Sequence, residues 1–545
     1  MKTLLALILV FTTLNLHTQT ADFDKLVLET FPADGPAGSV RVVKNGKTIY
    51  EKALGYADLE NKVAARTDHV FRIGSITKQF TAVAILQLAK DGKLALTDEI
   101  TKFLPDYPTQ GKKITVEQLL NHTSGIKSYT SMEKWTPEVH RKDFTPLELV
   151  DFFKNEPMDF DPGTKYEYNN SAYILLGVII EKVSGMTYAE YVQKNLFDPA
   201  GMKASYYDMA GPLIPNRAHG YSQKDGGGGG YVNCAYLSMT QPYSAGSLAS
   251  TTEDLCKWTA ALHSGKILDQ TWLKKAFQTT ILPDGTNTHY GFGWQMANIQ
   301  GSPTIEHGGG IHGFLSMMIY LPNEDVCVAA LSANDNNPPE DLTAKLAAIT
   351  IGKSYEAPAI QISEKELQAY TGVFENAKGD LRVLTVEKGR LQSRRINGGT
   401  FFLIPNGNDK FVFEKSLTAA HFKKAKGVVT EVIIIDRTSG ESVWKKSDKP
   451  IPEGPKEAKL TATQMDRLLG NYELAPGFVL TFSRKENQMF VQATGQPSFE
   501  IYPESETKFF MKVVPASCEF VLDGNGAAKE VLWTQGGQTT PAKKI

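Results

Sequence analysis

The last third of the 545-residue chain contains an internal repeat, which constrains the fold more than any other feature of the sequence. Gly372 and Gly470 are 98 residues apart, and three further anchors recur at the same offset. These anchors are Leu403-Ile404-Pro405 with Ile501-Tyr502-Pro503, Lys410-Phe411 with Lys508-Phe509, and Phe422 with Phe520. Short β-rich runs separated by turn residues surround them. The repeat therefore predicts two copies of a small β domain, over residues 364–447 and 460–541.

The preceding residues, 22–352, show a different pattern. Asn45-Gly46 separates two β-rich runs and readily supplies the two positive φ angles of a tight hairpin. Ile76–Lys90 contains neither glycine nor proline and is apolar on most sides, which predicts a buried helix with Ser75 at its N-terminal edge. Strands at both ends of a helical middle indicate an α+β domain closed by distant segments. The β-rich runs are 39–44, 47–54, 315–320 and 326–331.

The net charge of the chain indicates which partners to expect, and its first residues indicate where the protein is located. The chain has 58 Lys+Arg and 60 Asp+Glu, so it offers no basic footprint for nucleic acid. Met1-Lys2-Thr3, the apolar run Leu4–Phe11 and small polar residues up to Ala21 are typical of a secretory signal peptide over residues 1–21. The apolar run is too short to span a membrane. We expect an exported protein, periplasmic or secreted, without a membrane span.

The four cysteines are too few for a disulfide scaffold in a chain of this length. Buried thiols are the default expectation. A bridge between Cys234 and Cys256 stays open, because spacing alone does not decide it.

Ser75 and Lys78 are one helical turn apart, which places a hydroxyl and an amine on the same face of the expected helix. A partly desolvated lysine can stay neutral enough to take a serine proton. The Ser-x-x-Lys pattern recurs elsewhere, but only here does it open a long buried helix, whose first N–H groups can face a developing oxyanion. The alternative is that Ser75 only caps the helix.

Two other segments contain groups that suit the same chemistry. Tyr168, if it lies near ammonium groups, would have a lowered pKa and relay a proton to a leaving group, while Asn170 can hold a substrate amide. His307 precedes three glycines, Gly308–Gly310, which let a substrate backbone approach closely. By itself His307 is equally compatible with a structural histidine.

In this order the three motifs resemble those of the serine β-lactamase and penicillin-binding-protein superfamily, specifically the class C β-lactamase-like serine hydrolases. The resemblance covers about residues 38–352. It implies a β-lactamase/transpeptidase-like catalytic domain with an antiparallel sheet and a helical subdomain. Further segments that resemble the family are Asn121–Gly125, Pro162–Gly177, Ala245–Leu255, Tyr290–Trp294 and His307–Phe314.

The resemblance also implies roles for single residues. Ser75 would be the acylated nucleophile, Lys78 its proton acceptor, and Tyr168 the general base or acid for the leaving group and the hydrolytic water. The implied substrate-binding residues are Asn170, His307 and Gly309, and the implied oxyanion hole is formed by the N–H groups of Ser75 and Gly310.

The chain departs from the antibiotic-hydrolysing members, which have Lys-Thr-Gly where it has His307-Gly308-Gly309. A permanent cation and a hydroxyl that would bind a substrate carboxylate are both lost. The paired β domains resemble the lipocalin-like, or β-barrel, appendages of D-stereospecific aminopeptidases. We therefore expect an exported serine hydrolase, in the first place a peptidase acting on peptides that contain D-residues. A β-lactamase, an esterase and a non-catalytic cell-wall or ligand-binding protein are the alternatives.

No cofactor or metal is expected, since the chemistry needs only side chains and backbone N–H groups. Two signatures of zinc enzymes, H-E-x-x-H and H-x-H, are missing from the sequence. The expected partner is a small-molecule or peptide substrate, and the sequence leaves the oligomeric state open.

Overall fold

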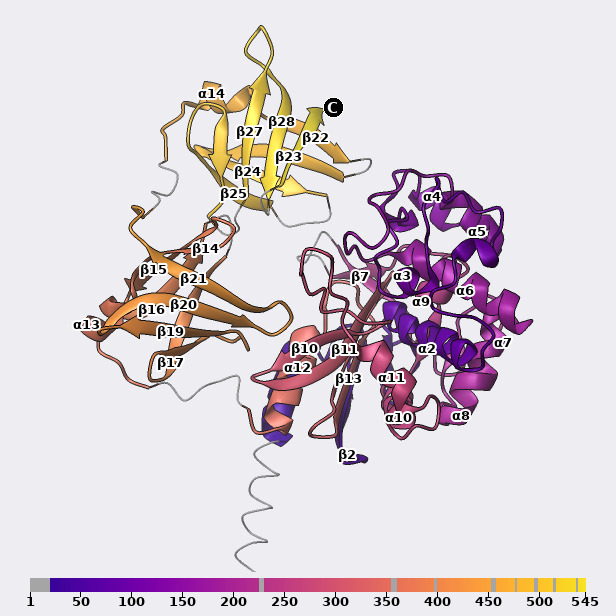
Figure 1. The fold of residues 1–545 in the computed structure, drawn as a ribbon. Coiled ribbons are helices and arrows are strands. Elements are labelled where there is room, and N and C mark those ends of the chain that lie inside the picture. The colour runs from indigo at the N-terminus through magenta and orange to yellow at the C-terminus, as the bar shows by residue number, and fades with distance from the viewer. Residues whose placement is uncertain are drawn as a thin grey trace, which may run out of the picture. The chain divides into compact units, whose positions relative to one another are not determined.

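The computed structural model describes residues 20–545 except 225–229, 354–359, 397–398, 452–456, 476–477, 495–497, 513–515 and 536–537. The predicted signal peptide lies almost wholly outside the described residues. The chain divides into two compact units, one formed mainly by residues up to 354 and one mainly by the residues that follow (Figure 1).

The first unit is built on a six-stranded antiparallel sheet with the order β10-β11-β12-β13-β1-β2. The hairpin β1–β2 comes from the start of the domain and pairs with β13 from its end, which confirms the predicted α+β fold closed by distant segments. Asn45 and Gly46 have φ of 50° and 71°, as their hairpin turn requires. The strands are β1 (Gly38–Lys44), β2 (Lys47–Leu54), β10 (Gln295–Ile299), β11 (Ser302–Ile311), β12 (Phe314–Leu321) and β13 (Val326–Ser332).

Helices cover both faces of this sheet: in Figure 1, α12 (Glu340–Thr350) lies on one side, with α2 (Thr77–Lys90) and α10 (Thr252–His263) on the other. The predicted long helix is α2, and a short 3-10 turn, η1 (Gly74–Ile76), contains Ser75 directly before it. Almost every side chain of α2 is buried, so this helix is the centre of the hydrophobic core.

The remaining helices of this unit are mostly short. They are α3 (Val116–Leu120), α4 (Pro137–His140), α5 (Pro146–Phe153), α6 (Asn170–Ser184), α7 (Tyr188–Val192), α8 (Asp198–Ala200), α9 (Tyr243–Gly246) and α11 (Gln270–Phe277). Short strands lie between them: β3 (Tyr56–Asp58), β4 (Val63–Ala64), β5 (Phe71–Arg72), β6 (Tyr206–Tyr207), β7 (Tyr221–Gln223), β8 (Tyr231–Asn233) and β9 (Leu248–Ser250). In the described part of the chain no single helix has the length and apolarity to cross a membrane, and only the bent pair 170–184 and 188–200 passes that test jointly.

Each predicted β domain is a closed barrel of eight antiparallel strands, so the repeat corresponds to two copies of one architecture. The short helices before the barrels, α13 (Glu364–Leu367) and α14 (Ala462–Asp466), keep the offset of the repeat. The first barrel contains β14 (Gly372–Asn376), β15 (Leu381–Glu387), β16 (Arg390–Arg395), β17 (Thr400–Gly407), β18 (Lys410–Phe413), β19 (Ala419–Ala425), β20 (Val428–Asp436) and β21 (Gly440–Ser447). The second contains β22 (Gly470–Ala475), β23 (Phe478–Lys485), β24 (Gln488–Ala493), β25 (Ser498–Pro503), β26 (Lys508–Phe510), β27 (Ala516–Leu522), β28 (Ala528–Gln535) and β29 (Gln538–Lys544).

The cysteines are all free thiols, and the bridge between Cys234 and Cys256 is not formed. Because α10 packs on β13, the neighbour of Cys256 is Cys327, with 3.2 Å between the two Sγ atoms. Cys234 lies instead beside Gly313. Spacing in the sequence does not reveal the contact of Cys256 with Cys327, because a helix packed on a sheet brings distant positions together.

Candidate active site

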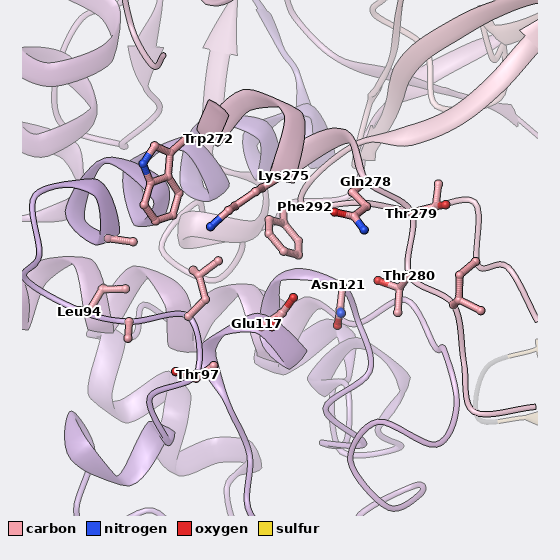
Figure 2. Close-up of a pocket in the computed structure, with 14 residues that line it drawn as sticks. Leu94, Thr97, Glu117, Asn121, Trp272, Lys275, Gln278, Thr279, Thr280 and Phe292 are labelled. Carbon is pink, nitrogen blue, oxygen red and sulfur yellow. The ribbon is translucent and has the colours of Figure 1, made fainter. Parts of the chain in front are cut away.

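Most of the residues that the sequence singled out line one cavity of about 290 Å³, while Lys78 and Asn170 lie behind its surface and contact each other. Its lining includes Ser75 from η1, Tyr168 from the residues before α6, and His307 with Gly308–Gly310 from β11. Asn169 caps α6 by accepting a hydrogen bond from the Ala172 N–H, which fixes the backbone that presents Tyr168. A larger cavity of about 670 Å³ lies elsewhere in the domain, and none of the predicted site residues lines it (Figure 2).

Glycines allow the turn that contains Ser75 to pack backbone against backbone on β11. Gly74 has φ of 49°, and a Cβ atom there would lie 2.9 Å from the Gly310 nitrogen. A Cβ atom on Gly309 would lie 2.0 Å from the Ile73 carbonyl oxygen. This approach brings the backbone around Ser75 next to the amide of Gly310, as an oxyanion hole built from the two N–H groups requires.

Lys78 is fully buried beneath Ser75. Its Nζ donates to Asn170 Oδ1 at 2.8 Å and to the Ala245 carbonyl at 3.0 Å, and it lies 3.2 Å from Ser75 Oγ. Burial holds the pKa of Lys78 well below its ordinary value, which favours the neutral amine. A neutral amine has two N–H groups and one lone pair. Because the two fixed acceptors take both N–H groups, the lone pair is left for the hydroxyl of Ser75.

Tyr168 lines the same cavity as Ser75, and its ring centroid lies 4.7 Å from Lys78 Nζ. The residue is 37% exposed, yet desolvation of its hydroxyl raises the pKa of Tyr168 above the ordinary value. The expected lowering of this pKa by nearby ammonium groups is therefore wrong. The expectation assumed two ammonium groups near Tyr168. Instead, the second position is occupied by the neutral His307, and the lowered pKa of Lys78 favours its neutral form. Tyr168 thus keeps its proton at neutral pH.

His307 is buried, and both of its ring nitrogens have partners inside the protein. Nδ1 lies 2.6 Å from the Gly308 carbonyl oxygen, and Nε2 lies 2.8 Å from the hydroxyl of Tyr290. A carbonyl only accepts, so the network assigns the proton to Nδ1 and makes Nε2 the acceptor from Tyr290. Burial lowers the pKa of His307 to about 4, so the third motif is uncharged at neutral pH.

Asn170 is half-buried and already bonded at both ends of its amide. Its Oδ1 accepts from Lys78, and its Nδ2 donates to Thr130 Oγ1 at 3.0 Å. One N–H of this amide is left for a substrate. The side chain therefore orients the lysine, and the role of Asn170 in binding a substrate amide stays a prediction.

Glu340 is a lining residue that the sequence analysis missed. It stands at the first position of α12, and among the described residues that line this cavity it is the only acidic one. No spacing pattern links it to Ser75, because only the packing of α12 on the sheet brings it to the cavity.

His122 is a second residue near the site to which the sequence analysis gave no role. It is fully buried beside Tyr168, and its Nε2 has no hydrogen-bond partner in the described structure. Burial keeps the pKa of His122 well below the ordinary value.

Comparison with known proteins decides the family of the first unit. Residues 27–352, more than half of the chain, match the family described as Beta-lactamase. The chain belongs to this family. A second match, to a Domain of unknown function (DUF3471), covers residues 454–543 and thus the second barrel.

Individual relatives extend this result. Penicillin-binding protein 4* of Bacillus subtilis is 25% identical over 92% of this chain and 93% of its own length. An octameric penicillin-binding protein homologue from Pyrococcus abyssi has a TM-score of 0.54 and 26% identity, covering 79% of this chain and 99% of its own. The D-amino acid amidase from Ochrobactrum anthropi SV3, solved with L-phenylalanine amide, has a TM-score of 0.53 and 27% identity, covering 61% and 99%. The protein is a serine hydrolase of the β-lactamase and penicillin-binding-protein superfamily.

Proposed function

We propose that this protein is an exported amidohydrolase that cleaves peptides or small amides containing a D-residue with a free α-ammonium group, through an acyl-enzyme on Ser75. The observation that carries the proposal is the charge of the cavity: His307 is neutral where the antibiotic-hydrolysing members of the family have a lysine, and Glu340 supplies a carboxylate. Such a lining favours a cationic substrate group over an anionic one. The sequence before residue 22 supports export.

Acylation follows from the hydrogen bonds around Ser75. The neutral amine of Lys78 takes the proton of the Ser75 hydroxyl, and Oγ attacks the substrate carbonyl carbon. The negative charge that develops on the carbonyl oxygen is stabilised by the N–H groups of Ser75 and Gly310. Tyr168, which keeps its proton at neutral pH, donates it to the leaving nitrogen as the C–N bond breaks.

Deacylation returns every proton to its starting group. The Tyr168 phenolate formed in the first half, stabilised by the Lys78 ammonium, takes a proton from water, and the resulting hydroxide attacks the acyl carbon. When the ester bond breaks, Oγ of Ser75 recovers a proton from Lys78. No cofactor is needed for either half of this cycle.

β11 provides a backbone edge on which a substrate can lie. β10 pairs with β11 only as far as Gln295 opposite Glu306, whereas β12 pairs with it through Ile311. Beyond Glu306 the backbone groups of Gly308–Gly310 on the β10 side are therefore open to an extended substrate.

The choice of D-residues is supported by the relatives, since two similar structures are described as a D-amino acid amidase and a D-stereospecific amidohydrolase. A β-lactamase would be expected to use a cation for the substrate carboxylate, and His307 does not supply one.

The test compares hydrolysis of D-alanine p-nitroanilide, its L-enantiomer and its N-acetyl derivative by the mature enzyme and by Ser75→Ala. We expect turnover of the free D-substrate, at least 10-fold weaker turnover of the other two, and none in the variant. Faster turnover of a chromogenic cephalosporin than of any anilide would make the protein a β-lactamase. Turnover of p-nitrophenyl acetate alone would make it an esterase, and no turnover of any substrate would favour the binding-protein alternative.

A further inference from the structure

The first barrel contains a buried arginine without an acidic partner. Arg382 on β15 is 8% exposed and shares the inward face of its strand with Leu384 and Val386, which belong to the barrel core. Its Nη1 donates to Ser393 Oγ at 2.7 Å, while its Nε is buried without any hydrogen-bond partner. Among the described residues, no carboxylate forms an ion pair with it. Burial of a charged guanidinium without an anionic partner costs free energy of folding, and a bound anion would offset that cost.

A second guanidinium stands beside the first. Arg395 is directly opposite Arg382 in the pairing of β15 with β16, and Trp444 lies under both, with ring centroid to Cζ distances of 4.7 Å for Arg382 and 5.8 Å for Arg395. Asp380 bonds to Arg395 at 2.9 Å, so the group holds two cations and one carboxylate. Burial, with a contribution from Arg395, lowers the pKa of Arg382 to about 10, so it remains charged at neutral pH. One positive charge is therefore left uncompensated.

The second barrel shows that the fold does not require these groups. At the repeat offset of 98 residues, Arg382, Ser393 and Arg395 correspond to Leu480, Val491 and Ala493. The register is the same, because Leu480 pairs with Ala493 as Arg382 pairs with Arg395. Trp444 likewise corresponds to Ala542. An equivalent barrel is thus closed and packed with only apolar side chains at these positions.

We propose that this end of the first barrel binds an organic carboxylate, held by Arg382 and Arg395 with its apolar part against Trp444. The unpartnered Nε and the adjacent Nη2 form the side-on edge of the guanidinium, which matches the two oxygens of a carboxylate. A single carboxylate also balances the one excess charge. Apolar side chains fill the rest of the barrel interior, so the site is at its end rather than deep inside.

The carboxylate has two possible sources, a free small molecule or the C-terminus of a peptide, and the probes distinguish them. Calorimetric titration of the full-length Ser75→Ala protein would use benzoate, hippurate and the neutral hippuramide. Hippurate presents its carboxylate on an amide-linked glycine, as a peptide does. We expect one site per chain for a carboxylate probe and no binding of hippuramide. Tighter binding of hippurate than of benzoate would indicate that the site takes a peptide C-terminus. Tighter binding of benzoate would indicate that it takes a free small-molecule acid.

Arg382→Leu installs the residue that the second barrel has, and Arg390→Leu is the matched control, because Arg390 lies in the same barrel with Glu414 as its partner. We expect the first variant to lose at least 10-fold in affinity without a lower melting temperature, and the control to bind within twofold of the parent. Arg382→Lys keeps the positive charge but loses the two parallel N–H donors of the guanidinium, so it should bind the carboxylate more weakly than the parent. Unchanged binding in Arg382→Leu, no carboxylate binding by the parent at millimolar concentration, or stronger binding of inorganic phosphate would overturn the proposal. Clear destabilisation by Arg382→Leu would instead assign the arginine a structural role and equally count against it.

Discussion

Gly309→Ala tests the close backbone contact on which the oxyanion hole depends. The added Cβ would lie 2.0 Å from the Ile73 carbonyl oxygen and 2.5 Å from Ser316 Oγ. Ordinary contact begins near 3.4 Å, so β11 and the turn that contains Ser75 must separate by about 1.4 Å. A displacement of about 1 Å in a catalytic group costs on the order of 100-fold in rate, and loss of one oxyanion donor costs about 100- to 1000-fold.

We therefore expect kcat/KM for the D-anilide to fall about 100- to 1000-fold, with overpacking lowering the free energy of unfolding by roughly 1–3 kcal/mol. Steady-state kinetics and urea unfolding measure the two effects separately. Gly211→Ala is the control, because a Cβ atom there meets nothing within 4 Å. If Gly309→Ala keeps kcat/KM within threefold of the parent, the two backbones do not form the proposed oxyanion hole.

Three other predictions follow from the same site. Lys78→Met should slow phosphonylation of Ser75 by at least about 1000-fold, because the hydroxyl loses its base; labelling followed by mass spectrometry measures the rate, and a change below tenfold contradicts the role. Glu340→Gln should raise KM roughly 10-fold for D-phenylalaninamide but not for its N-acetyl derivative, and an equal change for both substrates contradicts ammonium binding. His307 has a pKa of about 4 in the folded protein against 6.5 ordinarily, so between these values the unfolded chain binds more protons and the folded state loses stability as pH falls. This loss amounts to about 3 kcal/mol between pH 7 and 4. His122, whose pKa is also lowered by burial, destabilises the fold in the same direction, so urea unfolding should show a smaller loss in His307→Asn than in the parent, by about this amount.

Much of the fold was accessible from the sequence, because its strongest signals are local or strictly periodic. The 98-residue offset predicts two equivalent domains, and the glycine-free run after Ser75 predicts the central helix. Asn45-Gly46 predicts a hairpin because only a few residues adopt two successive positive φ angles readily. Each of these signals depends on neighbours in the chain or on a fixed repeat.

The missed features depend on contacts between distant segments. Glu340 reaches the cavity only because α12 packs on the sheet, and Cys256 meets Cys327 for a similar reason. The direction of the Tyr168 pKa shift depends on how its hydroxyl is desolvated, which residue order does not show. Arg382 becomes conspicuous only when the strand register of one barrel is compared with that of the other.

The central claim is that Ser75 is an activated nucleophile. Intact-protein mass spectrometry after exposure to a fluorophosphonate, with peptide mapping of the adduct, tests it most directly in the parent and in Ser75→Ala. The account predicts one adduct per chain, located on Ser75, and none in the variant. An adduct on another residue, or equal labelling of both proteins, would contradict it.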